Sequence, residues 1–598
     1  MEIRNIAIIA HVDHGKTTLV DALLKGGDVI AEHKQLEERA MDSDDQEKER
    51  GITIYAKNAS IFYKDTKINI VDTPGHADFG SEVERMLRTI DAAVLVIDAH
   101  EGPMPQTKFV LSKSLEVGLP VLVVINKIDK PTARPDEVVD LTFDLFAKLG
   151  ASDQQLDFPY IYAIAKDGVA IKNLDDEKKD ITPLLDFFLE HVPVAPADTT
   201  KPFRMQPATL AYDNFLGRMG IGRVYEGEVK ANQNVFVKTE DGKTRPGRIS
   251  KLFTFRGMER IEAQVAQAGD IVALAGIDDI FVGETITTDE KAELLPAIKV
   301  DPPALAMDFM VNDSPLSGRE GKLGSSRHIR ERLLKELETN VGLKVEMENN
   351  ADHFKVYGRG EMHIAVLIEN MRREGFELQV SKPEVVTQEI DGKVHEPIEN
   401  VVINCPDDMS GKIIETLSQR KGIMQNIVSK DGQTTLEFEI PTRGLLGFRS
   451  TFILLTKGEG TLYHSFSHFA PHCGKIEKRS VGSMISGNDG QAMGFALYNL
   501  QDRGPLFIGP QTEVYEGMII GEHNQGTDLV VNPIKGKKLT NVRASGSDDA
   551  IRLTPPLEMT LEKAIEYVQD EEYVEVTPSK IRLRKKYLKE HERKRSNK

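Results

Sequence analysis

The chain has 598 residues, a net charge of −18 at neutral pH and two cysteines, Cys405 and Cys473. A chain of this length is too long for one hydrophobic core, so about four or five domains are expected. Two cysteines cannot hold several domains together, which favours a reducing cytoplasm over a secreted location. No apolar run approaches the roughly 18 residues of a membrane span, and the N-terminus lacks a signal peptide, so membrane and export functions are not expected.

The negative charge is spread unevenly along the chain. Residues 576–598 contain ten Lys and Arg against two Glu, a net charge of +8, so the remainder carries about −26. An acidic protein with a basic end is expected to meet polyanions at that end and not over its whole surface.

Residues 10–18 (AHVDHGKTT) match a phosphate-binding loop. The apolar run 6–9 before them predicts a buried strand, and the apolar spacing of 19–24 predicts a helix. A strand, a tight loop ending in Gly-Lys-Thr and a helix form the context that such a loop requires. Backbone N–H groups at the start of this helix would hold the β-phosphate.

The side chains of this loop have separate expected roles. Lys16 should reach the β- and γ-phosphates, and the Thr17 hydroxyl should ligate Mg²⁺. Ala10 stands where the pattern usually has its first glycine, and a small residue still permits a tight turn. The predicted phosphate-binding residues of the loop are Asp13, His14, Gly15, Lys16, Thr17 and Thr18.

Two later segments complete the expected phosphate site. The segment RGIT ends at Thr53, a switch threonine that would complete the Mg²⁺ coordination only when the γ-phosphate is present. The apolar strand 67–71 ends in DTPGH, where Asp72 can hold Mg²⁺ through a water and the Gly75 N–H can contact the γ-phosphate. His76 follows where Ras-type enzymes carry a water-orienting Gln, and it is the predicted catalytic residue.

The strand 121–125 runs into NKID, which predicts selection of guanine. Asp129 can accept both N1–H and N2–H of guanine, whereas adenine would leave this charge unpaired at a cost of about 1–3 kcal/mol or more. Asn126 should hold the loop and the base edge, and the Lys127 stem should pack on the base face.

A last strand, 160–165, brings the Ala165 N–H toward guanine O6, although Ile164 occupies the position of the usual serine. The predicted guanine-binding residues are Asn126, Lys127, Ile128, Asp129 and Ala165.

The pattern predicts a multidomain α/β and α+β fold. A Pro/Ala linker at 192–197 marks the first boundary. The predicted parts are a P-loop GTPase domain (1–198), a β-barrel domain (199–300), two ferredoxin-like domains (301–388 and 389–480) and a β-rich C-terminal domain with a basic tail (481–598). The ferredoxin-like prediction rests on one repeated plan of strand, helix, β-pair, helix and strand.

Two local patterns in the C-terminal half allow more than one interpretation. The apolar run 494–498 resembles a strand. His464, His468 and His472 are spaced like metal ligands, but the Phe and Pro residues between them interrupt a helix, so a partly buried strand and loop is expected instead.

Two basic clusters in the last predicted domain favour contact with nucleic-acid phosphates over a solvated charged tail. The candidate RNA-binding residues are Lys535, Lys537, Lys538, Arg543, Lys580, Arg582, Arg584, Lys585 and Lys586.

The four nucleotide motifs together resemble those of the translational GTPases. The domain order is similar to that of elongation factor G, but no segment reads as its extended fourth domain. Three further stretches resemble the BipA (TypA) family: residues 73–80 (TPGHADFG), 441–449 (PTRGLLGFR) and 537–545 (KKLTNVRAS). The resemblance covers nearly the whole chain.

The resemblance implies a cytoplasmic, Mg²⁺-dependent GTPase that is stimulated by the ribosome and contacts ribosomal RNA, ribosomal proteins and A-site tRNA. It also implies a role in large-subunit assembly or stress-adapted translation. By the same resemblance, Val12 and Ile52 would form an apolar gate beside His76, and Asp13 would help to bind a monovalent cation such as K⁺. The chain is expected to be monomeric.

Two alternatives stay open from the sequence. One is a GTP-dependent RNA-binding scaffold for pre-ribosomal subunits, in which hydrolysis is only a release step. The other is a back-translocating elongation factor similar to LepA.

Overall fold

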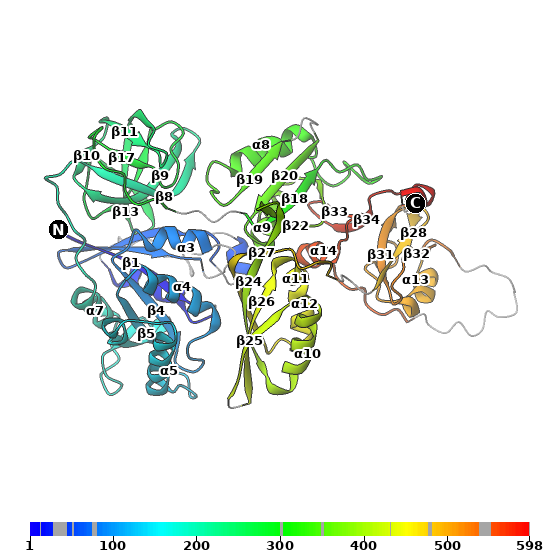
Figure 1. Ribbon diagram of the computed structural model, residues 1–598, viewed down its shortest axis with the longest axis horizontal. Helices are drawn as coiled ribbons and strands as arrows, with labels where there is room; N and C mark the ends of the chain where they lie inside the picture. The colour runs from blue at the N-terminus through cyan, green and yellow to red at the C-terminus, as the bar shows by residue number, and fades with distance from the viewer. Residues whose placement is uncertain are drawn as a thin grey trace, which may run out of the picture. The chain divides into compact units, whose positions relative to one another are not determined.

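The computed structural model describes residues 1–11, 13–27, 45–50, 53–74, 80–298, 303–347, 352–430, 432–476, 481–536 and 552–596. The chain divides into two compact units, Met1–Pro302 with Glu336–Gly342, and Pro303–Lys335 with Leu343–Lys598. Figure 1 shows the elements of each unit. None of the described helices is long and apolar enough to cross a lipid bilayer.

The first unit begins with a seven-stranded sheet in the order β2-β3-β1-β4-β5-β6-β7. Neighbours from β3 to β6 are parallel, whereas β2 and β7 run antiparallel at the two edges. The strands are β1 (Glu2–Ala10), β2 (Lys57–Tyr63), β3 (Thr66–Asp72), β4 (Ala92–Asp98), β5 (Val121–Asn126), β6 (Tyr160–Ile164) and β7 (Val169–Ile171). The helices are α1 (Lys16–Gly26), α2 (Asp45–Arg50), α3 (Gly80–Leu87), α4 (Pro105–Glu116), α5 (Pro135–Lys148), α6 (Asp153–Leu156) and α7 (Thr182–His191). The predicted doubly wound α/β domain is therefore confirmed.

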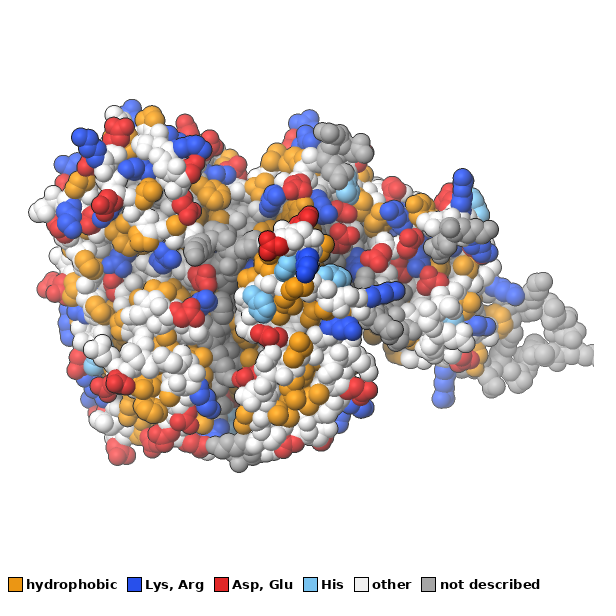
Figure 2. Space-filling model, viewed as in Figure 1, with side chains coloured by type: hydrophobic (Ala, Val, Ile, Leu, Met, Phe, Trp, Pro, Cys, Tyr) orange, Lys and Arg blue, Asp and Glu red, His pale blue; other side chains and the backbone are white. Residues whose placement is uncertain are grey.

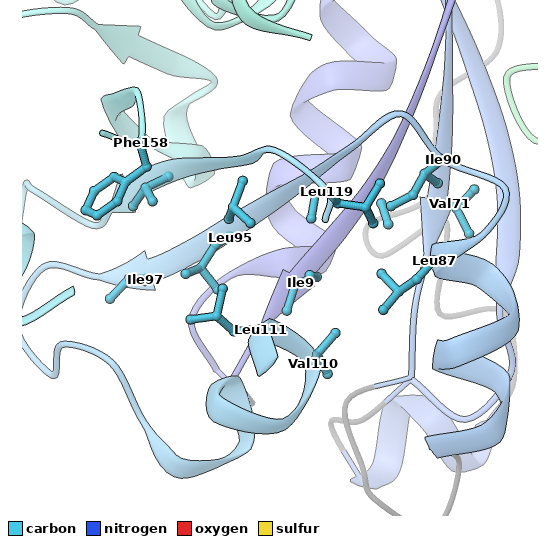
Figure 3. Packing of buried hydrophobic residues seen from close by; sticks show 14 of the residues in the cluster. Ile9, Val71, Leu87, Ile90, Leu95, Ile97, Val110, Leu111, Leu119 and Phe158 are labelled. Carbon is cyan, nitrogen blue, oxygen red and sulfur yellow. The ribbon is translucent and has the colours of Figure 1, made fainter. Parts of the chain in front are cut away.

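Helices cover both faces of this sheet. Because side chains alternate along a strand, successive residues of one strand contact opposite helix layers. Ile6 and Ile8 of β1 share a buried cluster with residues of α1 and α7. Ala7 and Ile9 share another with residues of α3, α4 and α5, part of which Figure 3 shows. Burial on both sides explains why these strands read as continuous apolar runs.

Ten antiparallel strands follow and enclose one hydrophobic core. Eight of them pair in the order β12-β11-β17-β8-β9-β16-β13-β14, and β10 pairs with β15. The strands are β8 (Arg204–Asp213), β9 (Gly217–Glu226), β10 (Glu228–Lys230), β11 (Asn234–Lys238), β12 (Thr244–Arg248), β13 (Lys251–Arg256), β14 (Glu259–Ala263), β15 (Val265–Gln267), β16 (Ile271–Ala275) and β17 (Thr285–Thr287). Val237 of β11 and Leu252 of β13 belong to the same core although they lie far apart in this order, so the sheet curls as a barrel does.

Buried polar side chains join the barrel to the amino ends of the parallel strands. Asp91, just before β4, accepts hydrogen bonds from Asn5 N (3.0 Å) and Asn5 Nδ2 (2.8 Å) and pairs with Arg223 Nη2 of β9 at 2.7 Å. Lys67 of β3 pairs with Asp270 at 2.8 Å, with side-chain exposures of 2% and 13%. The barrel is thus held at the edge of the sheet opposite the carboxyl ends of its strands.

The pair Lys67–Asp270 should contribute measurably to the stability of the first unit. Asp270→Asn removes the negative charge beside a buried ammonium, and we expect a loss of about 2–3 kcal/mol. Thermal unfolding followed by circular dichroism should show a lower Tm. The control is Asp241→Asn, which changes an exposed pair with Lys243 and should leave the Tm close to that of the parent. Equal Tm values for both variants would contradict the stabilising role of the buried pair.

The second unit opens with the first predicted ferredoxin-like plan. Its elements are β18 (Leu305–Met310), α8 (Ser326–Glu336), β19 (Lys344–Met347), β20 (His353–Gly358), α9 (Glu361–Arg373) and β21 (Leu378–Val380). The strands pair antiparallel in the order β19-β20-β18-β21, which places the first strand beside the third and fourth as this plan requires.

The same plan recurs in the next segment. Its elements are β24 (Lys393–Pro406), α10 (Asp407–Gln419), β25 (Ile423–Lys430), β26 (Gln433–Pro441), α11 (Thr442–Leu445), α12 (Phe448–Leu455) and β27 (Thr461–Pro471), with β23 (Gln388–Ile390) added at the start. Here β24 pairs with β26 and β27, and β26 pairs with β25, so the strand order repeats. The predicted repeat is confirmed, with its second helix broken into α11 and α12.

His464 and His468 lie on β27 and His472 directly follows it, as the strand-and-loop interpretation predicted. His464 Nδ1 lies 2.5 Å from Glu399 Oε2, and His468 is exposed. Among the described residues no group of three or more His, Cys, Asp and Glu side chains could hold a metal ion.

The C-terminal segment continues the sheet of the first ferredoxin-like plan. Its elements are β28 (Gly482–Ser486), β29 (Gly490–Gln491), α13 (Gly494–Leu500), β30 (Glu513–Val514), β31 (Met518–His523), β32 (Leu529–Val531), α14 (Leu561–Tyr567), β33 (Glu572–Val576), β34 (Ile581–Lys585) and α15 (Glu590–Ser596). Strand β33 pairs with β21, and the order continues as β33-β34-β31-β28-β32. One sheet therefore crosses the predicted boundary at residue 481, and the five domain ranges stay predictions.

The strand expected over 494–498 is wrong, because these residues form α13. Its buried residues Ala496, Leu497 and Leu500 are spaced as one face of a helix. A short apolar run is compatible with a buried strand or a buried helix until its packing partners are known.

Candidate nucleotide-binding site

The predicted phosphate and base motifs meet at the carboxyl ends of the parallel strands. Ala10 ends β1, Asp72 ends β3, Asp98 ends β4 and Asn126 ends β5. In open α/β sheets this edge is where ligands bind. The fold therefore brings together segments that lie more than a hundred residues apart in the sequence.

At Gly15 the phosphate-binding loop has a backbone conformation that only glycine adopts without strain. Gly15 precedes α1 with φ +96°, in the left-handed region. A β-carbon there would lie 2.4 Å from Nδ2 of Asn126, which itself donates a 2.9 Å hydrogen bond to the His14 carbonyl. Because the base loop approaches so closely, position 15 requires glycine. The first N–H groups of α1 begin directly after this glycine, at the carboxyl edge of the sheet.

Lys16, Asp72 and Thr53 converge beside this loop. Lys16 Nζ lies 2.7 Å from Asp72 Oδ1 and donates to the Thr73 carbonyl at 2.5 Å. Thr53 Oγ1 donates to Asp72 Oδ2 at 3.4 Å, and both side chains are buried. A carboxylate and a hydroxyl oxygen beside a helix N-terminus fit Mg²⁺, which prefers oxygen ligands and completes its shell with water and phosphate.

Asn126 links the base loop to the rest of the site. Its Oδ1 accepts the Ala165 N–H at 3.0 Å while its Nδ2 donates to the phosphate-binding loop. In this structure the Ala165 N–H therefore supports Asn126, and its contact with guanine O6 stays a prediction. Ile128 donates its N–H to the Ala163 carbonyl at 3.5 Å and packs on the core.

Asp129 and Lys127 of the base loop both contact neighbouring loops. The Asp129 carboxylate is partly exposed, with Oδ2 3.3 Å from Nζ of the exposed Lys166. Lys127 adopts φ +62° and donates from Nζ to the Asp13 carbonyl. The base loop therefore braces the phosphate loop at two consecutive residues, His14 and Asp13.

Asp98 is a site residue that the sequence reasoning missed. It is buried at the end of β4, and its Oδ2 lies 2.9 Å from Lys127 Nζ and 2.8 Å from Lys130 Nζ. Burial alone would raise the pKa of Asp98, but Lys130, the His100 N–H and Lys127 outweigh it and hold that pKa well below its usual range. A carboxylate closing an apolar strand at the carboxyl edge was the signal that could have identified it.

The His14 side chain has a structural position. It is fully buried, and its Nε2 lies 3.3 Å from Glu101 Oε2. A hydrogen bond with His14 lowers the pKa of the Glu101 carboxyl. The His14 ring is thus held in the interior, while its carbonyl accepts the Asn126 side chain.

Several predicted residues lie outside the described part of the chain. They are Val12, Ile52, Gly75 and His76 around the phosphates, and Lys537, Lys538 and Arg543 in the basic cluster.

The basic end is only partly available to a polyanion. Arg582, Arg584 and Lys585 are buried on β34 and form ion pairs with Glu575, Asp313 and Glu572, respectively. Lys535, Lys580 and Lys586 are exposed. The structure thus corrects the candidate set, because these three cations are buried and each is paired with a carboxylate of the protein.

Outside the basic end, positive and negative side chains are mixed on the surface. On the face shown in Figure 2, Lys and Arg side chains are interspersed with Asp and Glu. No single-sign field covers that face, which agrees with the expectation that polyanions are not bound over the whole surface.

Family models match most of the chain. The matches are Elongation factor Tu GTP binding domain (residues 1–194), Elongation factor Tu domain 2 (217–287), Elongation factor G C-terminus (393–480) and TypA/BipA C-terminal domain (481–590).

Proteins named large ribosomal subunit assembly factor BipA are similar over essentially the full length. The Haemophilus influenzae protein is 53% identical, covering 100% of this chain and 97% of the relative. The Synechocystis protein is 52% identical, covering 98% of each. The Escherichia coli K12 protein is 51% identical, covering 100% of this chain and 98% of the relative. A crystal structure of a Thermus thermophilus protein shares the fold, with a TM-score of 0.55 and 17% identity over 79% of this chain and 97% of that chain.

A phosphate-binding loop, a guanine loop and an attached barrel on this sheet define a translational GTPase. Full-length relatives above 50% identity and the matched C-terminal domain also identify the particular family within this class. The chain belongs to the BipA family.

Proposed function

We propose that this protein binds and hydrolyses GTP on the ribosome and acts in assembly of the large ribosomal subunit. Full-length similarity to relatives named large ribosomal subunit assembly factor supports the assembly role most directly. The convergence of Lys16, Thr53 and Asp72 supports its chemical half. The expected setting is the cytoplasm, with the protein as a monomer that contacts ribosomal RNA, ribosomal proteins and A-site tRNA.

Each element of the site has a proposed role. Thr17 and Thr53 would hold Mg²⁺ through hydroxyl oxygens and Asp72 through a water. When bound, Mg²⁺ neutralises charge on the β- and γ-phosphates. Lys16 would leave Asp72 for the phosphate oxygens, since its ammonium already lies at the carboxyl edge.

The remaining roles rest on the family resemblance. His76 would orient the attacking water after passing the gate of Val12 and Ile52, and the Gly75 N–H would contact the γ-phosphate. Asp13, whose φ of +65° turns the loop, is the proposed neighbour of a K⁺ ion.

The competing function is a scaffold that binds pre-ribosomal particles and uses hydrolysis only for release. Sedimentation of the protein with a non-hydrolysable GTP analogue against separated subunits and whole ribosomes distinguishes the two. Binding to whole ribosomes, together with ribosome-stimulated hydrolysis in a parallel assay with GTP, supports the first proposal. Binding to separated subunits alone supports the scaffold, and back-translocation of ribosomes would support the LepA-like alternative.

The exposed basic residues should set the salt dependence of ribosome binding. Replacing Lys535, Lys580 and Lys586 by Gln should make the fall of log affinity with log salt less steep. The magnitude of the slope should decrease by about one for each phosphate that these lysines neutralise. Deleting residues 580–598 is not a suitable test, because it would remove β34 from the sheet.

Lys178, Lys179 and Lys243, exposed in the first unit, give a control triple of equal charge change. Filter binding over a salt series measures both slopes, while GTP affinity should be unchanged. An unaltered slope for the first triple would assign those lysines to the solvated surface.

A further inference from the structure

Three consecutive backbone N–H groups directly after Thr53 donate to two acidic side chains. The N–H groups of Ile54 and Tyr55 donate to Glu47 Oε1 at 2.9 and 3.1 Å. The Ala56 N–H donates to the Glu82 carboxylate. Glu47 lies on α2 and Glu82 on α3, so two separate elements hold one short stretch of backbone.

Both carboxylates lie where a charge is costly. The Glu47 side chain is fully buried and pairs with Lys57. Glu82 is 16% exposed, and its Oε1 lies 3.9 Å from Nη2 of the buried Arg85. Burying an ionised group costs several kcal/mol unless it is paired and hydrogen-bonded, so such placement indicates a specific contact.

These contacts determine where Thr53 lies. Thr53 is 4% exposed, and the following Ile54 is fully buried. With the next three peptide groups held, the Thr53 hydroxyl is directed to Asp72, whose other oxygen lies 2.7 Å from Lys16. Loss of either carboxylate would leave buried N–H groups unsatisfied and release this stretch.

We propose that Glu47 and Glu82 are positioning residues that clamp the backbone after Thr53 and tie its Mg²⁺-ligating position to α3. This inference rests on the proposed role of Thr53 as a ligand that acts only with the γ-phosphate. The clamp therefore favours GTP over GDP, because only the triphosphate uses the position that the clamp secures.

The test measures the affinities of fluorescent GDP and a fluorescent non-hydrolysable GTP analogue with Mg²⁺ present. Glu47→Ala should weaken binding of the GTP analogue about tenfold and change GDP binding by less than about twofold. Glu47→Gln should recover most of the loss, since its amide oxygen still accepts the N–H groups of Ile54 and Tyr55. Glu82→Ala and Glu82→Gln should follow the same order.

Glu49→Ala is the matched control, because Glu49 is exposed on the same helix. Thr53→Ala separates the inference from the function on which it rests. If Thr53→Ala leaves the GTP-to-GDP preference unchanged, the proposed role of Thr53 is wrong. If Thr53→Ala lowers that preference and either Glu47→Ala or Glu82→Ala leaves it unchanged, the clamp is wrong.

Equal weakening of both nucleotides by Glu47→Ala would overturn the clamp by showing that Glu47 only supports the fold. The double variant Glu47→Ala/Thr53→Ala should lose no more preference than Thr53→Ala alone, and additive losses would contradict the coupling. If Glu47→Ala is insoluble, the single variants Glu47→Gln and Glu82→Ala are measured in its place. An unchanged preference for GTP over GDP in Glu82→Ala then refutes the clamp.

Discussion

Alanine at position 76 is expected to lower ribosome-stimulated GTP hydrolysis about 10²–10⁴-fold, or roughly 3–5 kcal/mol of barrier. Phosphoryl transfer depends on positioning and charge stabilisation, and the sequence offers no residue with a clear claim to be an arginine finger. His76 is therefore the group expected to orient the water, and ribosomal RNA phosphate would favour its charged form. Nucleotide and ribosome binding should be nearly unchanged.

Single-turnover hydrolysis on saturating ribosomes is the measurement for His76→Ala. His191→Ala is the control, because His191 is an exposed histidine at the end of α7, away from the carboxyl edge. A His76→Ala variant that keeps more than about a third of the parental rate would remove His76 from the mechanism.

The second large effect is expected at the base. Asp129→Asn replaces a double acceptor by an amide with one acceptor and one unwanted donor. Loss of two charge-assisted hydrogen bonds should weaken GTP binding by about 3–4 kcal/mol, roughly 10²–10³-fold. Xanthosine triphosphate should bind the variant better, because its C2 oxygen accepts the new donor.

Competition between GTP and xanthosine triphosphate measures this change of preference. Lys166→Ala is the control, since the exposed pair of Lys166 with Asp129 should contribute at most about 1 kcal/mol. Parental GTP affinity in Asp129→Asn would show that another residue selects the base.

Local sequence was sufficient for the elements that position the site. The apolar runs ending at Asp72 and Asn126 predicted parallel strands, because strands buried on both faces must be apolar throughout. The Gly-Lys-Thr sequence predicted the loop before α1, since few backbones place N–H groups at a helix start in this way. The repeated ferredoxin-like plan followed from the order of the elements alone.

Tertiary structure alone decided which charged groups are available. Arg582, Arg584 and Lys585 counted as surface cations in the sequence, yet the folded sheet buries them beside carboxylates, two on the paired strand β33 and one at the distant Asp313. Local charge density does not report such partners, because ion pairing depends on long-range packing.

Dependence on tertiary packing also explains why the sequence predicted the ligand-binding residues and not the residues that position them. Lys16, Thr53 and Asp129 belong to motifs whose spacing follows from the chemistry of the ligand, so the sequence alone determined them as candidates. Asp98 and Glu47 act through groups brought close only when the chain folds. Their carboxylates resemble many other acidic residues in an acidic chain, and only burial beside a specific donor shows what they do.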